Sequence, residues 1–158
     1  MMNFSAEKLE VRKLAPEDGS AFNLLIHLFN EVFEEDEPAI SSETNLFKLL
    51  SNTHFVALAA FYENEIVGGL TAYELPMYYS ENSEMFLYDL AVKPDYQRMG
   101  IGKRLLHRLN EYCLEKGMLA FFVLAHEEDQ HALEFYHSTG GKSEKVVNFL
   151  YKVTRASE

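Results

Sequence analysis

A loop between residues 97 and 104 combines residue types that suit a bound anion. Glycines at 100 and 102 carry no Cβ, so the backbone can approach a ligand closely and direct its N–H groups toward it. The loop opens into a helix whose N-terminus bears partial positive charge, and Arg98, Lys103 and Arg104 add full charges. The spacing matches neither the dinucleotide-binding glycine motif nor the P-loop. We predict a cradle for a pyrophosphate, with a glycine turn before a surface helix as the alternative.

The apolar strand expected to lead into this loop, residues 85–92, contains one charge, Asp89. A buried carboxylate without a partner is costly, so Asp89 must have a hydrogen-bond partner or face a wet cavity. A carboxylate at such a position could attract a cationic ligand and act as a general base. The alternative is a structural aspartate bonded to the backbone or to Tyr88.

The negative charge of the chain is concentrated in one region. The formal net charge is −11, yet residues 14–92 carry fourteen acidic side chains against one basic side chain, Lys48. The flanking regions are nearly neutral. This balance excludes nucleic acid as the main partner, because phosphate binding needs a basic face. We interpret the acidic region as the side that receives a small cationic acceptor, with solubility as the alternative.

Length and cysteine content limit the class of protein. A chain of 158 residues is near the size of one domain and no linker divides it, so we predict a single domain over 1–158. One cysteine, Cys113, excludes an internal disulfide and favours a cytoplasmic protein; it falls in a helical stripe of leucines, where packing is its expected role. The histidines lack metal-ligand spacing, so no metal is expected. No apolar run approaches the ~18 residues of a membrane span, so no membrane partner is expected.

Hydrophobic spacing predicts strands and helices that alternate along the chain. Strands are expected near 9–13, 54–61, 66–75, 85–92, 119–125 and 146–153, and helices near 22–33, 43–50, 102–116 and 132–139. Residues 63 and 64 form the turn of a hairpin between the second and third strands. This order predicts a mixed α/β (α+β) sheet with helices on both of its faces.

Two motifs make the sequence similar to a known family. The pattern Gln97-x-x-Gly100-x-Gly102 follows Asp89-Leu90-Ala91-Val92, and about thirty residues later Ala132-Leu133-Glu134-Phe135-Tyr136 precedes Gly140-Gly141. Both blocks resemble, in order and spacing, those of the GNAT superfamily of N-acetyltransferases. The resemblance implies a GNAT-type, largely antiparallel sheet of six to seven strands, and acetyl-CoA as the co-substrate.

Within that superfamily, the chain is similar to aminoglycoside 3-N-acetyltransferases of the gentamicin-resistance type. The similarity includes segments outside the cofactor loop: Phe55–Phe61, Tyr73–Pro76, Leu87–Val92 and the acidic Glu127-Glu128-Asp129. It implies an aminoglycoside as the acceptor, and a homodimer as the assembly.

The resemblance also implies a role for each matching residue. Backbone N–H groups around Met99–Lys103 would bind the CoA pyrophosphate, the edge of the strand at Leu90–Val92 would pair with the pantetheine arm, and the Tyr136 phenol would protonate the departing thiolate. An ordinary core aromatic is the alternative for Tyr136. The cofactor residues implied are Leu90, Ala91, Val92, Gln97, Arg98, Met99, Gly100, Ile101, Gly102, Lys103 and Tyr136. The acceptor residues implied are Tyr88, Asp89, Glu127, Glu128 and Asp129.

The function expected is transfer of acetyl from acetyl-CoA to a primary amine of a small polycationic acceptor, in a ternary complex and at the 3-N position of an aminoglycoside. No cysteine or serine has a credible activating partner, which disfavours an acetyl-enzyme. A polyamine or general amine N-acetyltransferase is the first alternative. A non-catalytic acyl-CoA-binding sensor is an alternative of another class, which the presence of both Tyr136 and Asp89 disfavours.

Overall fold

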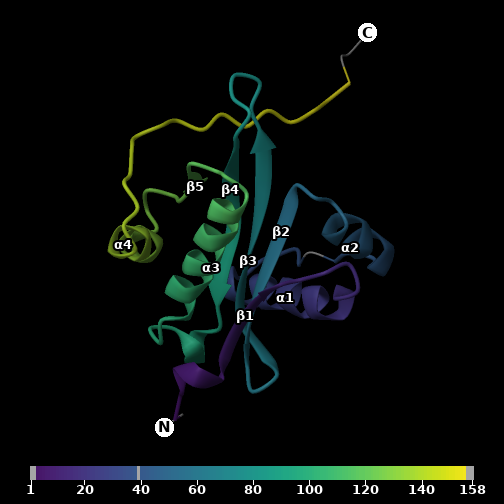
Figure 1. Ribbon diagram of the computed structural model, residues 1–158, viewed down its shortest axis with the longest axis vertical. Coiled ribbons are helices and arrows are strands. Elements are labelled where there is room, and N and C mark those ends of the chain that lie inside the picture. The colour runs from purple at the N-terminus through teal and green to yellow at the C-terminus, as the bar shows by residue number, and fades with distance from the viewer. Residues whose placement is uncertain (1–2, 39, 156–158) are drawn as a thin grey trace. The chain divides into compact units, whose positions relative to one another are not determined.

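The computed structural model describes residues 3–38 and 40–155. The chain divides into two compact units, Met1–Leu124 and Ala125–Glu158, which are described separately. The elements of the first unit follow the predicted order (Figure 1). Their bounds are β1 Leu9–Lys13, α1 Gly19–Val32, α2 Glu43–Leu50, β2 Phe55–Tyr62, β3 Glu65–Pro76, β4 Ser83–Val92, α3 Ile101–Glu115 and β5 Phe121–Val123, with short 3₁₀ helices at Ala6–Lys8 and Pro94–Tyr96.

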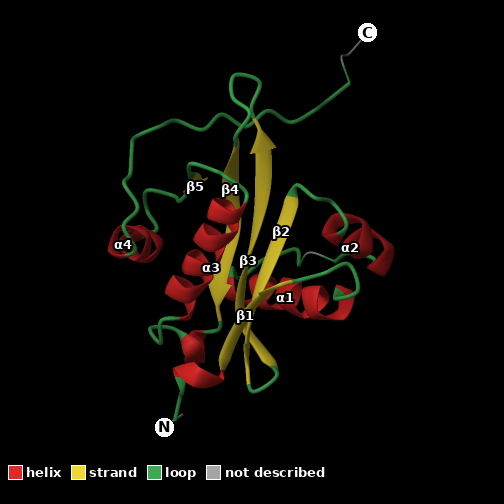
Figure 2. Cartoon of the chain, viewed as in Figure 1, coloured by secondary structure: helices red, strands yellow, loops and turns green. Residues whose placement is uncertain are grey.

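The five strands form one mixed, mainly antiparallel sheet in the order β1-β2-β3-β4-β5 (Figure 2). Of the strand pairs that the structure describes, β1–β2, β2–β3 and β3–β4 are antiparallel and β4–β5 is parallel. The predicted hairpin joins β2 to β3 through Glu63 and Asn64, whose positive φ angles of 49° and 70° match the right-handed twist of the strands. The mixed sheet of the prediction is therefore confirmed within the residues described.

Helices cover both faces of the sheet, as predicted. Phe55, Ala57 and Ala59 alternate along β2 and belong to a core cluster with the buried residues of α1 and α2. Helix α3 packs against the strands through the opposite face, where a Cβ on Gly68 would lie 3.4 Å from Ile101. Because successive strand residues point to opposite faces, the apolar run of β2 serves both cores.

The close packing of α1 on the sheet depends on Gly69 of β3. A Cβ at this position would lie 2.4 Å from Cδ1 of Leu25 on α1 and 2.7 Å from the carbonyl oxygen of Leu58 on β2. Both distances are below any normal contact, and the second involves backbone, which cannot turn away. Gly69 therefore sets how closely α1 approaches the sheet.

Two irregularities distinguish β4 from the other strands. Thr71 pairs with Asp89 and the next β3 residue, Ala72, pairs with Leu87, so Tyr88 is an extra residue in a β-bulge. On its other side, β4 pairs with β5 only through residues 85–87. Among the residues described, no strand pairs with the β5-side edge of β4 beyond Leu87.

The second unit contains one helix, α4 (Gln130–Ser138), within the residues described. The Asp129 carboxylate caps its start by accepting the Ala132 N–H at 3.0 Å. The helix ends at Ser138; Gly140, two residues later, has φ 96°, and the Gly141 N–H donates to the Tyr136 carbonyl at 2.9 Å. These two contacts fix both ends of the short helix.

The prediction of six to seven strands was wrong for the residues described, since five are present. The missing strand is the one expected at 146–153, where the backbone of residues 142–155 has no regular secondary structure. An apolar run predicts a strand only if a neighbouring strand completes its hydrogen bonds, and none pairs with this segment. Its apolar side chains, such as Leu150 and Tyr151, are exposed.

Candidate active site

The loop before α3 has the backbone conformation expected of an anion cradle. Gly100 takes the N-cap position in the left-handed region with φ 81°, and Arg98 is also left-handed with φ 59°. No side chain caps the helix, so its first N–H groups are left for another acceptor. A Cβ on Gly100 would meet nothing within 4 Å, which means that glycine is needed for its φ angle and that the space beside it is open.

Side chains on both sides of the loop hold it in place. The Gln97 side-chain amide donates to the Val92 carbonyl at 3.0 Å, which ties the loop to the end of β4. The Arg104 guanidinium donates to the Ala6 carbonyl at 2.8 Å, so this cation also anchors the N-terminal segment. Arg98 and Lys103 are exposed, and their charges add to that of the helix terminus.

The edge of β4 at Leu90–Val92 is the second predicted part of the cofactor site. Because β5 leaves β4 after Leu87, the structure describes no strand that pairs with this edge. The Val92 carbonyl already accepts from Gln97, whereas no strand hydrogen bonds occupy the rest of this edge in the residues described. An extended polar ligand can pair here as a further strand would.

Asp89 faces the side of the sheet that α1 covers. Directly paired residues of neighbouring strands point to the same face, and the flanking pair on β3 and β4, Gly69 with Ala91, lies on the α1 face. The bulge at Tyr88 keeps the Asp89–Thr71 pair on this face. Burial raises the pKa of the Asp89 carboxyl, and the nearby negative charge of Glu35 raises it further. A carboxylate with a raised pKa is a stronger base.

The negative charge next to Asp89 comes from the segment that ends α1. The Glu35 N–H donates to the Asn30 carbonyl at 3.1 Å and the Glu34 N–H to the Glu31 carbonyl at 3.3 Å. These two bonds form a helix-ending motif in which Glu34 has φ 52°, a conformation that glycine usually supplies. Sequence reasoning ended this helix near residue 33 and did not place Glu35 near Asp89.

Tyr88, predicted to bind the acceptor, lies on the same face as Asp89. Its ring is 5.6 Å from that of Tyr73 on β3 and 5.6 Å from that of Phe86 on β4, and it is 58% exposed. Burial raises the pKa of Tyr73, and the charges of Tyr88 and Asp89 raise it further, which agrees with this placement. The sequence analysis did not predict Tyr73 or Phe86 as residues of the site. The adjacent polar residues Tyr88 and Asp89, which break the alternation of the strand, are the signal that could have indicated a bulge.

The remaining predicted residues belong to the second unit. Tyr136 is half-buried in α4, with its ring centre 5.2 Å from that of Phe135. Glu127 and Glu128 are exposed before the helix. The Asp129 carboxylate has a structural role as the cap of α4. The catalytic and acceptor-binding roles of these residues stay predictions.

Cys113 is a packed core residue. Its side chain is 97% removed from solvent, and burial, with a smaller effect of Glu74, raises its pKa to about 11. The thiol is therefore neutral near pH 7, and a neutral thiol is a poor nucleophile. Among residues 3–38 and 40–155, no three His, Cys, Asp or Glu side chains lie close enough to hold a metal ion. None of the helices described has the length and apolarity to cross a membrane.

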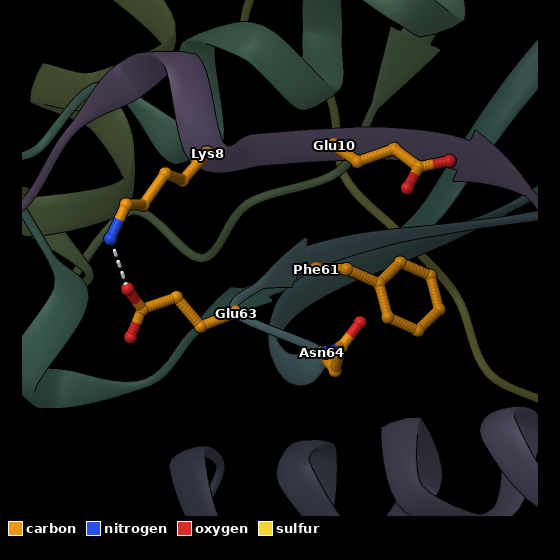
Figure 3. A pocket seen from close by; sticks show the side chains of 5 residues that line it. All are labelled: Lys8, Glu10, Phe61, Glu63 and Asn64. Atoms are coloured by element: carbon orange, nitrogen blue, oxygen red, sulfur yellow. Dashed lines mark hydrogen bonds and ion pairs between the residues drawn. The ribbon is translucent and has the colours of Figure 1, made fainter.

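A surface hollow of about 370 Å³ lies elsewhere, between β1 and the β2–β3 turn (Figure 3). It is lined by Lys8, Glu10, Phe61, Glu63 and Asn64, and the Lys8 ammonium points at the Glu63 carboxylate, with which it forms an ion pair. The positive charge of Lys8 in this hollow is therefore paired with the carboxylate of Glu63. None of its lining residues belongs to the loop before α3 or to the Asp89 region.

Acetyltransferases are among the solved structures and curated proteins to which the chain is similar. An aminoglycoside acetyltransferase from an uncultured soil metagenomic sample, solved in complex with sisomicin, is 42% identical with a TM-score of 0.91; the match covers 94% of this chain and 98% of that one. A second soil metagenomic aminoglycoside acetyltransferase is 35% identical with a TM-score of 0.88, covering 92% and 99%. Spermidine N(1)-acetyltransferase of Thermoplasma acidophilum is 28% identical over 86% of this chain and 89% of that enzyme.

A shorter match relates the chain to the ribosomal protein bS18 alanine N-acetyltransferase of Escherichia coli K12, at 29% identity. It spans 48% of this chain and 51% of that enzyme, so the match covers only about half the length of this curated relative.

The model of the acetyltransferase (GNAT) family matches residues 22–140. This range contains Asp89, the loop before α3 and Tyr136, the features on which the predicted resemblance depended. The resemblance to aminoglycoside acetyltransferases is confirmed as well, by the two similar structures. The chain belongs to the acetyltransferase (GNAT) family.

Proposed function

We propose that the chain acetylates a primary amine of an aminoglycoside, at the 3-N position, with acetyl-CoA as the donor. One observation carries the proposal: Asp89, a half-buried carboxylate with a raised pKa, lies in the strand whose open edge leads into an uncapped, glycine-containing helix terminus. A base for the amine and a cradle for an anionic donor thus occupy one strand–loop–helix segment. The relative solved with sisomicin supports the choice of acceptor class.

The residues of the loop fit the phosphate groups of CoA. Gly100 leaves open space beside the N-terminus of α3, and the exposed side chains of Arg98 and Lys103 bring two positive charges to it. Leu90–Val92 would hold the extended pantetheine arm along the edge of β4. Acetyl-CoA supplies the reactive thioester, and these residues orient it and polarise its carbonyl.

Asp89 prepares the acceptor for attack. At neutral pH most primary amines are ammonium ions, which have no lone pair, so a base must remove one proton, directly or through water. The negative charge of Asp89 attracts the ammonium, and its raised pKa brings proton affinity closer to that of the amine. The Tyr136 phenol is the proposed acid that returns a proton to the leaving thiolate.

Transfer is proposed to occur directly between the two bound substrates. The alternative, an acetyl-enzyme, needs an activated nucleophile, and the thiol of Cys113 is buried and neutral near pH 7.

A polyamine is the second candidate acceptor. The similarity to the Thermoplasma acidophilum spermidine N(1)-acetyltransferase extends over most of both chains, and the acidic region 14–92 would attract any polycation. A non-catalytic acyl-CoA sensor, which would not be an enzyme at all, requires that Asp89 and Tyr136 have no chemical role.

The proposal also includes the assembly and location of the protein: a homodimer in the cytoplasm. Sedimentation of the purified protein tests the homodimer, and fractionation of the source cells tests the location.

A thiol-release assay tests the function. Purified protein is mixed with acetyl-CoA and sisomicin, spermidine or amino acids, and the product of sisomicin is mapped by NMR to identify the acetylated nitrogen. Release with sisomicin and a 3-N product is expected. Release with spermidine alone would select the second candidate, and saturable CoA binding with no release across the panel would select the sensor.

A further inference from the structure

Aromatic rings form a continuous row across four strands of the sheet. Phe55 on β2 lies 5.1 Å from Tyr73 on β3, which lies 5.6 Å from Tyr88 on β4. Phe86, also on β4, is 5.6 Å from Tyr88 and stacks on Phe122 of β5 at 4.9 Å with only 7° between the rings. The row therefore runs from the core beneath α1 to the last strand of the sheet.

The bulge in β4 brings this row and Asp89 to the same face. Phe86 pairs with Tyr73 and Phe122 pairs with Phe86, so all three residues share the face on which Phe55 packs against α1. Tyr88, the extra residue of the bulge, contacts Tyr73 and Phe86 and so points the same way. The next residue along the strand is Asp89, which follows Tyr88 on this face.

The outer end of the row is open to solvent, whereas its inner end is buried. Phe55 is 2% exposed, but Tyr88 is 58% and Phe122 is 40% exposed. Phe86 is half-buried, and its ring plane differs from that of Tyr88 by 73°, so the two rings meet at nearly a right angle. Such a corner offers a ligand the face of one ring and the edge of another.

The charge around the row complements one kind of ligand. Asp89 adjoins Tyr88, Glu35 acts electrostatically on Asp89, and the region 14–92 carries one cation, Lys48, against fourteen carboxylates. Aromatic faces attract cations through the ring quadrupole and attract apolar C–H groups by dispersion. A ligand that carries both ammonium groups and apolar ring faces gains from each contact.

We propose that the exposed rings of Tyr88 and Phe122, with the half-buried ring of Phe86 between them, form a platform that selects amines borne on saturated six-membered rings over linear polyamines. The inference rests on the proposed function and names the feature of the acceptor that the site recognises. A cyclohexane or sugar ring presents several C–H groups in one rigid plane to an aromatic surface. A linear polyamine presents the same methylene groups but must lose chain rotations to lie flat.

The experiment compares two small diamines that are both dications near neutral pH and have six carbons each, 1,4-diaminocyclohexane and linear 1,6-diaminohexane, together with sisomicin and spermidine. Acetylation is followed by thiol release, and equilibrium binding of each amine is measured by calorimetry, a readout that needs no turnover. The variants are Tyr88→Ala, Tyr88→Leu, Tyr88→Phe and Phe122→Ala. Phe47→Ala on α2 is the matched control, because Phe47 is an aromatic of nearly equal exposure, 57%, outside the row.

We expect the wild type to prefer the cyclic diamine, and Tyr88→Ala and Phe122→Ala each to weaken its binding and kcat/KM by about three- to tenfold. The linear diamine should change by less than about twofold. Tyr88→Phe keeps the flat ring and the preference, whereas Tyr88→Leu keeps apolar area but loses the preference. Phe47→Ala should leave both amines unaffected.

Equal losses for the cyclic and linear amines, or full preference retained in Tyr88→Leu, would overturn the platform. A wild type that binds cyclic amines preferentially, loses this in Tyr88→Ala, yet acetylates none of them would support the platform while contradicting the proposed function. Acetylation of both diamines with no preference would leave the proposed function intact and remove the platform.

Discussion

Asp89 on β4 pairs with Thr71 on β3 at the first position after the bulge that Tyr88 makes in the ladder. In a regular strand, Tyr88 and Asp89 would point to opposite faces. The extra residue shifts the alternation, so both side chains lie on the face that α1 covers. The bulge thereby places a carboxylate and an exposed aromatic ring side by side, next to the open edge of β4.

Asp89→Asn tests the proposed base. The variant keeps the shape of the side chain but cannot accept the amine proton, so we expect kcat to fall by about 10²- to 10⁴-fold. In the wild type the rate should rise with pH as Asp89 ionises, in a range above that of an ordinary carboxyl because the pKa is raised. This rise should disappear in the variant; a pH–rate profile of unchanged shape would rule out Asp89 as the base.

The companion variant Glu35→Gln removes the second cause of the raised pKa while leaving burial in place. We expect the acidic limb of the pH–rate profile to move to lower pH.

The raised pKa of Asp89 also determines how the free energy of unfolding depends on pH. A raised folded-state pKa stabilises the fold only while Asp89 is protonated, and this contribution is lost as the pH rises through that pKa. Asp89→Asn should therefore unfold at a higher temperature than the wild type near pH 8, with the difference vanishing below the pKa of an ordinary carboxyl.

Tyr136→Phe tests the proposed acid. Loss of the phenol should lower kcat by about ten- to a hundredfold, because the thiolate then leaves without a positioned proton donor. Binding of CoA, measured by calorimetry, should change little, since the ring itself is retained. Tyr136 also supports the end of α4 through its carbonyl, which the substitution does not alter. An unchanged kcat would assign Tyr136 to packing alone.

Cys113→Ala tests direct transfer. If no acetyl-enzyme forms on this thiol, kcat should stay within about twofold of the wild type, while the free energy of unfolding should fall by about 1 kcal/mol because a core side chain is shortened. The native wild-type thiol should also resist alkylation at pH 8, since its pKa is about 11. Loss of turnover in a folded Cys113→Ala protein, or an acetylated Cys113 seen by mass spectrometry, would contradict direct transfer.

Glu34→Gly tests the strained end of α1. Glycine adopts φ 52° without the steric cost of a side chain, so the free energy of unfolding should rise by about 0.5–1 kcal/mol. Gly117, which ends α3 at φ 71° with nothing near its Cβ position, is the matched control: Gly117→Ala should lower the stability by a similar amount. Denaturant unfolding measures the free energy of unfolding of both variants. A lower value for Glu34→Gly than for the wild type would show that the Glu34 side chain stabilises the fold.

Gly69→Ala tests the close packing of α1 on the sheet. The new methyl group would overlap Leu25 and the Leu58 carbonyl, so we expect a loss of about 1–3 kcal/mol. At Gly19, the first residue of α1, a Cβ meets nothing within 4 Å, and Gly19→Ala should be neutral or stabilise the fold by up to about 1 kcal/mol. Equal melting temperatures for the two variants would contradict the close packing.

Local patterns in the sequence predicted most elements and both functional motifs. Helix α2 has the predicted bounds, and β4 leads into the glycine-containing loop as expected. The bulge was missed because it is a property of the pairing between β3 and β4, which periodicity in one strand does not describe. The proximity of Glu35 to Asp89 and the stacking of Phe86 on Phe122 were missed for the same reason, since each joins segments far apart in the chain. The prediction of a strand at 146–153 was wrong because an apolar run does not itself provide the neighbouring strand with which it must pair.

The open edge of β4 has a consequence for the behaviour of the protein in concentrated solution. Exposed strand edges promote association of one chain with another, because each unpaired edge can template a further strand. This edge lies at the end of the acidic region 14–92, whose carboxylates precede it in the sequence, and like charges repel two approaching copies. We therefore expect the charge proposed to attract a cationic acceptor also to maintain colloidal stability, so that high salt, which screens that repulsion, favours self-association.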